Sequence, residues 1–467
     1  MTHQTQEDIA LRKALDSADD FRYSHQISGL NEETVRAISA HLNEPQRMLE
    51  HRLRSLELFL SMPMPSWWPD LSSINFDELV YYASPEQSEI QQDWDKVDPL
   101  IKEKFARLWI PEAEQRYLAW AWWQMDSEVV YHKIKEKRAE QWVIFEDMSE
   151  ALIHHEELVK KYFMKLIPAN DHKFMALHGA VWSGGTFIYV PQWVQVNEPL
   201  QAYFRMNSLS GGQFEHTLII VDDDAQCDYI EWCSAPKFNT RSLHAWGVEV
   251  YVWKRAKMRY SSVENWSINT YNLNTKRGIV EDDGFLERVN WNLGSGVTML
   301  YPCSILKWDR SRSDQLGVAV AAKWQNQDTG SKVIHIWKDT ASTIVSKSIS
   351  KDWWIATYRG IVDIKKSAQW AINWTECDAL LMDDQSISTT IPHIHVGNDS
   401  STVAHEASAW KVDDTMLFYL MSRGLSEEKA MTMVVNGFIS DVVKKLPLEY
   451  AWELNRLIEM EMEWSVG

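Results

Sequence analysis

The feature that most constrains the fold is a stretch from about residue 174 to 410 in which short β-rich runs follow one another without a helical pattern between them. Clusters of Gly, Asp, Asn and Ser, which are typical of turns, separate the runs. A parallel α/β fold needs a helix between successive strands, so the pattern excludes it. A sandwich, a propeller or a solenoid remains, and a recurrence of roughly 20 residues without a propeller signature favours a β-solenoid.

Helical patterns flank this stretch on both sides. The segment NEETVRAISAHLNEPQRMLEHRLRSLELFLSM starts at the capping residue Asn31 and carries apolar residues at helical spacing. Helical periodicity returns from about Asp413, where Gly424 fits the end of one helix and Ser426 the start of another. We therefore expect a helical N-terminal region over 1–165, a β core over 166–410 and a C-terminal helical region over 411–467.

The charge of the chain argues against two classes of partner. The 467 residues carry a formal net charge of −19, which repels nucleic acid backbones and anionic membrane surfaces. The N-terminus lacks the basic start and apolar run of a secretory signal, and no stretch approaches the length of a membrane helix. We expect a cytoplasmic protein whose four cysteines act, if at all, as thiols.

Two cysteines have polar neighbours at a spacing of about one solenoid coil. Cys377 precedes the pair His405 and Glu406 by 28 residues, so the three side chains could share one patch suited to iron or zinc. Arg205 precedes Cys233 by the same interval, and a guanidinium there would favour the thiolate. From spacing alone, a buried structural cysteine is the better interpretation at both positions.

Several long motifs, together with the segments NEPQRMLEHRLRSLELFLSMPMP and DSEVVYH, resemble one known family from about residue 28 to the C-terminus. That family is the SufB/SufD family of the SUF iron-sulfur cluster assembly system, and the resemblance is to its SufB branch. The motifs that carry it are AVWSGGTFIYVP, EPLQAYFRMN, TLIIVDDDA, YNLNTKRG, ASTIVSKSIS, TYRG, CDALLMDD, FYLMSRGLSEE and LPLEYAWELNRLIEMEMEWSVG.

The resemblance implies a fold, a function and a set of partners. The implied fold is a right-handed parallel β-helix core between helical N- and C-terminal regions. The implied function is that of a scaffold, not an enzyme, on which a transient iron-sulfur cluster is built. The partners would be a SufD-like subunit on the core, a SufC-like ATPase on the C-terminal helices, and a cysteine desulfurase with a sulfur carrier. Binding of a reduced flavin is left open.

The resemblance also assigns roles to residues. Cys377 falls on the cluster-building cysteine of the family, and His405 and Glu406 fall on its His-Glu pair, which makes the three the implied metal ligands. The residue before that pair is often acidic in relatives and is Ala404 here. Cys233 matches the cysteine implicated in receiving sulfur. The implied polar path for sulfur through the β-helix comprises Arg205, Asn207, Glu264, Trp266 and Lys276, with Glu264 in place of a common Gln.

The separation of the two cysteines limits how sulfur could move between them. Cys233 and Cys377 are 144 residues apart, which suggests about six coils and roughly 30 Å at about 4.8 Å per coil. Direct thiol exchange would be out of reach at that distance. Sulfur is therefore expected to pass through the solenoid interior or to arrive by another route.

Two other functions remain open from the sequence. A β-helix carbohydrate-active enzyme would need paired acids on neighbouring coils. The acidic runs 222–224 and 383–384 look more like turn residues than like such a pair. A SufD-type partner subunit is the other alternative, although Cys377 and the long N-terminal region favour the SufB branch.

The tryptophan content raises a separate question. The chain has 25 Trp and only 18 Gly, and many tryptophans stand where relatives carry glycine. Glycine is selected where the backbone takes a positive φ, so tryptophan is the least suitable replacement. We hypothesise that these positions are glycine in the living protein, as expected if UGA codons that specify glycine were translated as tryptophan. The positions are Trp68, Trp109, Trp120, Trp122, Trp142, Trp193, Trp232, Trp291, Trp324 and Trp464.

Overall fold

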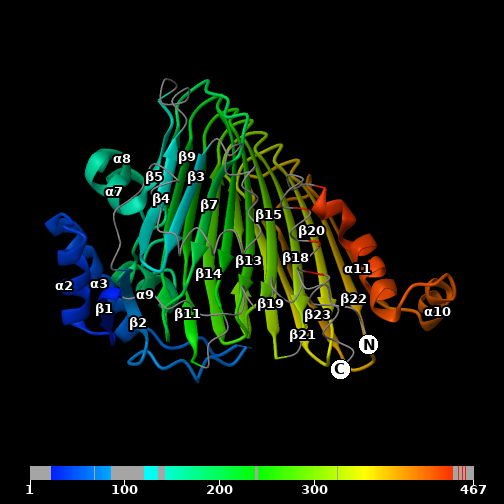
Figure 1. Ribbon diagram of the computed structural model, residues 1–467. Coiled ribbons are helices and arrows are strands. Elements are labelled where there is room, and N and C mark those ends of the chain that lie inside the picture. Colours follow the sequence, from blue (N-terminus) through cyan, green and yellow to red (C-terminus); the bar gives the residue numbers. More distant parts are fainter. Residues whose placement is uncertain are drawn as a thin grey trace.

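The computed structural model contains two parallel β-sheets that face each other along the length of the chain. It describes residues 23–67, 69–85, 120–134, 142–236, 240–322 and 324–444, together with 451, 455 and 458. The chain alternates between the sheets and forms a β-solenoid of about eight turns (Figure 1). The predicted parallel β-helix with helices at both ends is thereby confirmed.

The first sheet has ten strands. From one edge to the other they are β24 (Thr402–Lys411), β22 (Ile372–Leu381), β20 (Ala341–Ser350), β18 (Arg312–Ala321), β15 (Phe285–Gly294), β13 (Lys257–Trp266), β10 (Gln226–Ser234), β7 (Leu200–Arg205), β3 (Trp120–Met125) and β4 (Glu128–Ile134).

The second sheet has twelve strands and lies opposite the first. Its main path is β23 (Ile387–Val396), β21 (Ile355–Ile364), β19 (Asn326–His335), β16 (Val297–Leu300), β14 (Thr270–Val280), β12 (Gly247–Val252), β9 (His216–Val221), β6 (Thr186–Val190) and β5 (Ile144–Asp147). Three short strands join it beside this path: β8 (Gly212–Gln213), β11 (Ser242–His244) and β17 (Cys303–Leu306).

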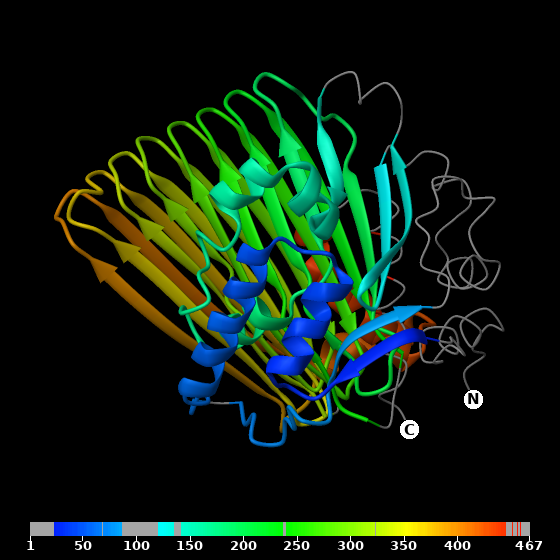
Figure 2. The same cartoon turned by 90° about the vertical axis from the view of Figure 1, so that its left-hand side faces the viewer.

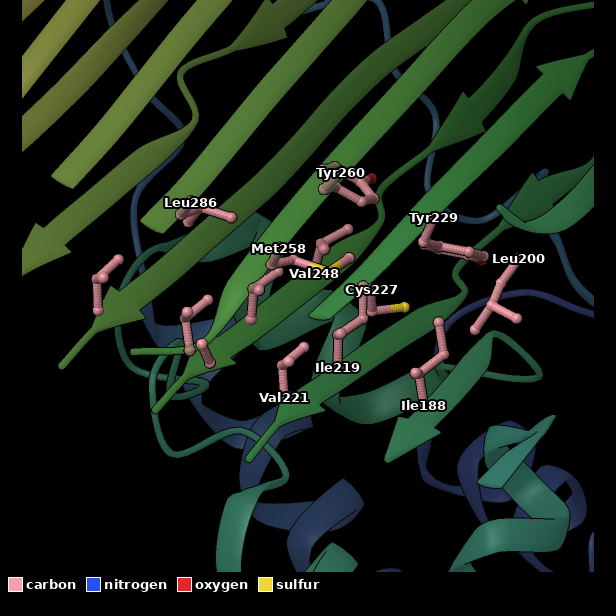
Figure 3. Close-up of a cluster of buried hydrophobic side chains, with 14 of the residues drawn as sticks. Ile188, Leu200, Ile219, Val221, Cys227, Tyr229, Val248, Met258, Tyr260 and Leu286 are labelled. Atoms are coloured by element: carbon pink, nitrogen blue, oxygen red, sulfur yellow. The ribbon is translucent and has the colours of Figure 1, made fainter. Parts of the chain in front are cut away.

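We call the space between the two sheets the lumen, and side chains fill it. Along each strand alternate residues face the lumen, because successive side chains of a strand point to opposite faces. At the N-terminal end the lumen is largely apolar, as the cluster around Ile219, Val248 and Leu286 shows (Figure 3). Farther along the solenoid, serine, asparagine and glutamine take over many inward positions, such as Asn290 and Gln315.

Helices cover the outer faces of both sheets. Residues of α3 and α9 pack on the outer side of the twelve-stranded sheet, and α11 packs on the ten-stranded sheet (Figures 1 and 2). None of the helices that the structure describes is both long and apolar enough to cross a membrane. The helices are α2 (Glu32–His41), α3 (Gln46–Ser61), α7 (Met148–His154), α8 (Glu156–Tyr162), α9 (Lys173–Val181), α10 (Asp414–Ser422) and α11 (Glu427–Val443).

The region before residue 166 also contains strands. A separate antiparallel pair, β1 (Tyr23–Ser28) and β2 (Val80–Pro85), stands outside the solenoid sheets. Strands β3 and β5 precede residue 166 and join the two large sheets. The sheets therefore begin earlier in the chain than the sequence pattern predicts, because β3 and β5 are short.

The corners between strands repeat from coil to coil. One corner residue in each coil has a positive φ and donates its backbone N–H to the next coil, to a carbonyl in every case but the last, where Trp370 donates to the Ser400 hydroxyl at 3.0 Å. Trp193 begins this series at φ 69° and Trp370 ends it at φ 56°. Between them the same position is held by Asp224, Arg255, Asp283, Arg310 and Asp339.

Three of the suspected tryptophans have left-handed backbone. They are Trp142, Trp193 and Trp324, with φ of 59°, 69° and 68°. Trp353 and Trp370, which the sequence comparison did not single out, share this conformation. A positive φ is unusual for any bulky residue, so these five positions agree with the glycine hypothesis.

The remaining suspected tryptophans lie in strands or outside the described residues. Trp232 and Trp291 are buried in regular strands. Trp120 and Trp122 lie in β3, but their side chains are outside the described part. Trp68, Trp109 and Trp464 are outside the described residues.

Candidate functional site

Cys377 faces the lumen near one end of the solenoid. It lies in β22, is 4% exposed, and has Ser346 on one neighbouring strand and Ala407 on the other. Burial raises the pKa of the thiol to about 12, and the hydroxyl of Tyr358 beside it offsets part of that rise. Without a metal or a further cation the thiol is therefore protonated at neutral pH.

His405 lies on the next strand and faces the same way. Its register partner in β22 is Thr375, two residues before Cys377 and on the same side of the strand. About 4.8 Å between strands and about 3.3 Å per residue place the Cα atoms of His405 and Cys377 about 8 Å apart. The imidazole Nε2 is buried without a hydrogen-bond partner among the described residues, and burial lowers the pKa of the ring. A neutral imidazole with an unused nitrogen is a suitable metal ligand.

Glu406 points to the other face of the same strand. It is exposed on the outside of the solenoid, where its register partner is Glu376. Adjacent residues of a strand alternate faces, so a His-Glu pair cannot present both side chains to the lumen. The expected shared patch therefore contains Cys377 and His405 without Glu406. Within the described part of the chain, no group of three or more His, Cys, Asp and Glu side chains could hold a metal ion.

The Cys377–His405 pair lies at an open end of the solenoid. Strand β24 is the edge of the ten-stranded sheet, and β23 is the edge of the twelve-stranded sheet. Apolar side chains of this last coil are exposed, among them Ile387, Ile391, Ile394 and Val396. A long edge with exposed apolar residues favours pairing with another strand. A second chain seated there would lie next to His405.

Cys233 lies deep in the lumen on β10. It is fully buried and its register partner on β13 is Glu264. Burial, followed by the carboxylates of Glu264, Glu215 and Glu231, raises the pKa of the thiol well above its usual value. The thiol is therefore buried, as the interpretation from spacing alone has it, and it is protonated at neutral pH.

Glu264 and Lys276 form an ion pair beside this cysteine. The Lys276 Nζ donates to Glu264 Oε1 at 2.6 Å, and neither side chain is exposed. The amides of Asn272 and Asn274 donate to the other carboxylate oxygen at 2.6 Å and 2.8 Å. Burial favours the neutral acid, but Lys276 and the hydrogen bonds outweigh it, so the pKa of Glu264 is lowered.

Trp266 belongs to the same polar group. It follows Glu264 by two residues and faces the lumen, where its ring lies 4.3 Å from that of His244. His244 bonds to Asn272 at 2.8 Å through Nδ1 and to Glu215 at 3.1 Å through Nε2. Cys233, Glu264, Trp266 and Lys276 are therefore brought together, as the resemblance implies.

Arg205 and Asn207 lie outside this group. The register partner of Cys233 on β7 is Phe204, so Arg205 stands next to Ser234, and its Nη1 donates to the Ser234 hydroxyl at 3.3 Å. The alternative in which this guanidinium favours the Cys233 thiolate finds no support, because the two side chains are on opposite faces of the sheet. Asn207 follows the end of β7, where its backbone N–H donates to Asp126 at 2.7 Å.

Sequence reasoning missed a carboxyl group in the lumen. Glu231 is fully buried, and its carboxyl accepts hydrogen bonds from Thr217 at 2.8 Å and from Tyr260 at 2.5 Å. Burial raises its pKa to about 7. The signal for it was the alternation Tyr229, Glu231, Cys233, which places the three side chains on one face of β10.

The two cysteines are closer than expected. Strands β10 and β22 are separated by five steps across the sheet, through β13, β15, β18 and β20, which is about 24 Å. The sequence-based estimate of six coils between Cys233 and Cys377 is too large, because each coil has close to 30 residues. Direct thiol exchange is still out of reach. The inward residues between them are small or polar, and those aligned with the two cysteines are Ser262, Glu264, Asn290, Asn292, Gly317, Ala319, Ser346 and Ser348.

Two family models match most of the sequence of this chain. Residues 204–438 match the family described as "SUF system FeS cluster assembly, SufBD core domain". Residues 120–202 match the family described as "SufBD protein N-terminal region". The chain is a member of the SufBD family of iron-sulfur cluster assembly proteins.

Within that family the similarity is to SufB-type proteins. The chain is 51% identical to the iron-sulfur cluster assembly protein SufB of Bacillus subtilis over 439 residues. This aligned region covers 94% of each chain. It is 50% identical over 449 residues, or 96% of each chain, to an iron-sulfur cluster assembly SufBD family protein of Staphylococcus aureus.

Proposed function

We propose that this chain is a scaffold on which nascent iron-sulfur clusters are assembled, with Cys377 and His405 as its own cluster ligands. The observation that carries the proposal is their position on adjacent strands, facing one side, at the open edge of the solenoid. A thiolate and an imidazole are both iron ligands, and two ligands leave coordination positions for sulfide and for a second chain. Glu406 on the outer face would bind iron only after the edge strand rearranges.

The exposed edges support a SufD-like partner. Strands β23 and β24 each span ten residues and have an unpaired side among the described residues. A partner solenoid that continues both sheets would cover the exposed isoleucines of β23 and close the lumen over Cys377 and His405. Closure would exclude water from the growing cluster.

The C-terminal helices support a second partner. In α10 and its neighbour α11, five large apolar residues are exposed: Met416, Phe418, Tyr419, Met421 and Met433. A Met-rich exposed surface favours protein docking. We assign this surface to a SufC-like ATPase, with ATP hydrolysis in that partner and no catalysis in this chain. Sulfur would come from a cysteine desulfurase through a carrier.

Anaerobic reconstitution with iron and sulfide, read by visible absorption, tests the scaffold role. Cys377→Ser should abolish the cluster chromophore of the complex, because a hydroxyl is a far weaker iron ligand than a thiolate. Cys303→Ser is the matched control, since Cys303 is also buried but lies away from β22 and β24. Wild-type absorption in Cys377→Ser would exclude Cys377 as a ligand.

The role of Cys233 needs a different sulfur source. Cys233→Ser should assemble clusters from free sulfide but not from a persulfide-loaded carrier. If the substitution impairs both assays to the same degree, Cys233 is not a sulfur acceptor and the relay through the lumen is excluded.

The carbohydrate-active alternative finds no support in the acidic runs that prompted it. Asp224 is a corner residue paired with Arg255 at 2.5 Å, and Asp383 accepts hydrogen bonds within its own turn from Gln385 and Ser386. These carboxylates stabilise turns, as the sequence indicates.

A further inference from the structure

Arg288 is a fully buried arginine that forms no hydrogen bond with the described residues. It lies in β15, its side chain faces the lumen, and none of its three guanidinium nitrogens has a hydrogen-bond partner among the described residues. By contrast Arg52, which is also fully buried, bonds to Glu44 through two nitrogens, at 2.7 Å and 2.6 Å. A buried charge is strongly disfavoured unless it is paired, so Arg288 calls for a negative or polar partner from outside the chain.

Among the residues that the structure describes, no carboxylate compensates the charge of Arg288. The groups that act on its charge are Tyr260 and Cys303, and burial raises the pKa of both, so both are neutral at pH 7. Burial lowers the pKa of Arg288 itself to about 10, which leaves it cationic at neutral pH. The site is therefore a buried positive charge that lies over the neutral ring of Tyr260, 5.8 Å from its centroid, and has no anionic partner among the described residues.

The shape of the opposite wall accommodates the guanidinium. A Cβ atom at Gly278 on β14 would lie 2.7 Å from Nη2 of Arg288, so the guanidinium reaches across the lumen to the bare backbone of the other sheet. On the next strand, Gln315 Oε1 is also buried without a partner. Polar atoms without partners thus gather at one point of the lumen.

Arg288 stands between the two cysteines. Its strand β15 is two steps from β10, which carries Cys233, and three steps from β22, which carries Cys377. These steps correspond to about 10 Å and about 14 Å. The register also aligns Arg288 with the inward row that ends at His405 and runs through Gln315, Ile344 and Thr375.

We propose that Arg288 forms an anion-binding site in the lumen that holds hydrosulfide, supplied as free sulfide, between Cys233 and Cys377. The ligand must be small, because Tyr260 and Leu286 crowd the same stretch of the lumen (Figure 3). It must carry one negative charge to match one guanidinium. Binding is non-covalent, so no bond forms or breaks at Arg288. The assignment of hydrosulfide rests on the proposed function, whereas the anion site does not.

Bromide tests the anion site directly. Crystals of the full chain soaked in sodium bromide should show an anomalous peak within hydrogen-bond distance of the Arg288 guanidinium. The peak should be absent in Arg288→Met and should disappear when sulfide is added in competition. The site is overturned if no peak is found or if only water contacts the guanidinium. A bromide peak that sulfide does not displace overturns the hydrosulfide assignment.

Cluster assembly tests the role of the site. In Arg288→Met the sulfide concentration for half-maximal assembly should rise at least about tenfold, as expected for the loss of hydrogen bonds from a charged donor. Arg288→Lys, which keeps the charge, should recover part of the loss. Arg312→Met removes an exposed charge and should leave the sulfide dependence unchanged.

Folding and function can be separated in these variants. Arg288→Met should have a thermal midpoint at or above that of the wild type, since an apolar side chain replaces an unpaired buried charge. An unchanged sulfide dependence in a folded Arg288→Met excludes the transit role. If the wild type assembles no cluster, the proposed function fails, while the bromide result still decides whether the anion site exists.

Discussion

The ion pair between Glu264 and Lys276 shows how single residues set the properties of the lumen. Both side chains are fully buried, so each depends on the other for compensation. Removal of one partner leaves a buried charge, whereas removal of both leaves a neutral polar site. The two substitutions should therefore not be additive.

Lys276→Met should lower the free energy of unfolding by about 3–5 kcal/mol at pH 8. The loss should be smaller at pH 5, because Glu264 without its cation can be protonated there and then carries no buried charge. The double variant Glu264→Gln with Lys276→Met should regain most of the stability. Urea unfolding of the three proteins at both pH values measures this. Equal losses in the single and double variants would contradict the coupling.

The corner tryptophans give a second test at the scale of residues. Trp193 and Trp370 extend the series of left-handed corner residues in which the other members are Asp and Arg. Both indole side chains are more than half exposed, at 66% and 56%, so burial offers little compensation for the backbone conformation.

Trp193→Gly and Trp370→Gly should each stabilise the protein by about 1 kcal/mol, since glycine takes a positive φ at low cost. Trp291→Gly is the contrasting variant: Trp291 is fully buried in a regular strand, and its removal should destabilise this chain. Thermal unfolding separates the two outcomes. Peptide mass spectrometry of protein from the native host, or UGG codons at these positions, would decide the glycine hypothesis independently.

At the scale of elements, coil length determines which predictions of proximity hold. The spacing of 28 residues between Cys377 and His405 differs by two from the actual register of 30, and a difference of two keeps a side chain on the same face. The spacing between Arg205 and Cys233 differs by one from the register of 29, which reverses the face. The sequence reveals an approximate repeat, but the exact number of residues in each corner decides the face.

The edge strands provide the test at this scale. Ile391 and Ile394 of β23 are 42% and 44% exposed, so replacing both by lysine should leave the isolated chain folded. In the proposed complex the two lysines would be desolvated at the edge, and binding of the SufD-like partner should weaken by at least about a hundredfold. Size-exclusion chromatography and titration calorimetry measure this.

Ile372→Lys is the control for the edge variant. Ile372 is 56% exposed on β22, which is already paired on both sides, so the substitution should leave partner binding unchanged. Equal weakening in both variants would indicate a general charge effect instead of an interface at the edge.

At the scale of the whole molecule, the sequence predicted the architecture but not the content of the lumen. Repeated short strands without intervening helices were enough to indicate a solenoid. Which of the polar residues face inward was visible only where alternation is regular, as around Glu231. The close approach of Arg288 to Gly278 joins different sheets and depends on how the two walls are placed, which no local pattern encodes.

A buried acid makes the stability of the whole chain depend on pH. The pKa of Glu231 is about 7 in the folded protein because of burial, against an ordinary value of 4.5. Between these values the folded state keeps a proton that the unfolded state has released. The contribution of Glu231 therefore makes the free energy of unfolding fall as the pH rises from 4.5 to about 7 and level off above pH 7. Buried histidines such as His216, whose pKa is lowered to about 3, have the opposite effect. Below pH 6.5 the unfolded state binds the proton that the folded state excludes, so their contribution makes the free energy of unfolding rise with pH.

Glu231→Gln isolates the carboxyl from the histidines, because it removes the titration of one group and leaves the others in place. The stability of the variant relative to the wild type should rise by about 3 kcal/mol between pH 4.5 and pH 7.5, whatever constant offset the lost hydrogen bonds introduce. Urea unfolding at several pH values measures the difference. Parallel curves for the two proteins would mean that Glu231 ionises at its ordinary pKa, and the lumen would then be far better solvated than its burial indicates.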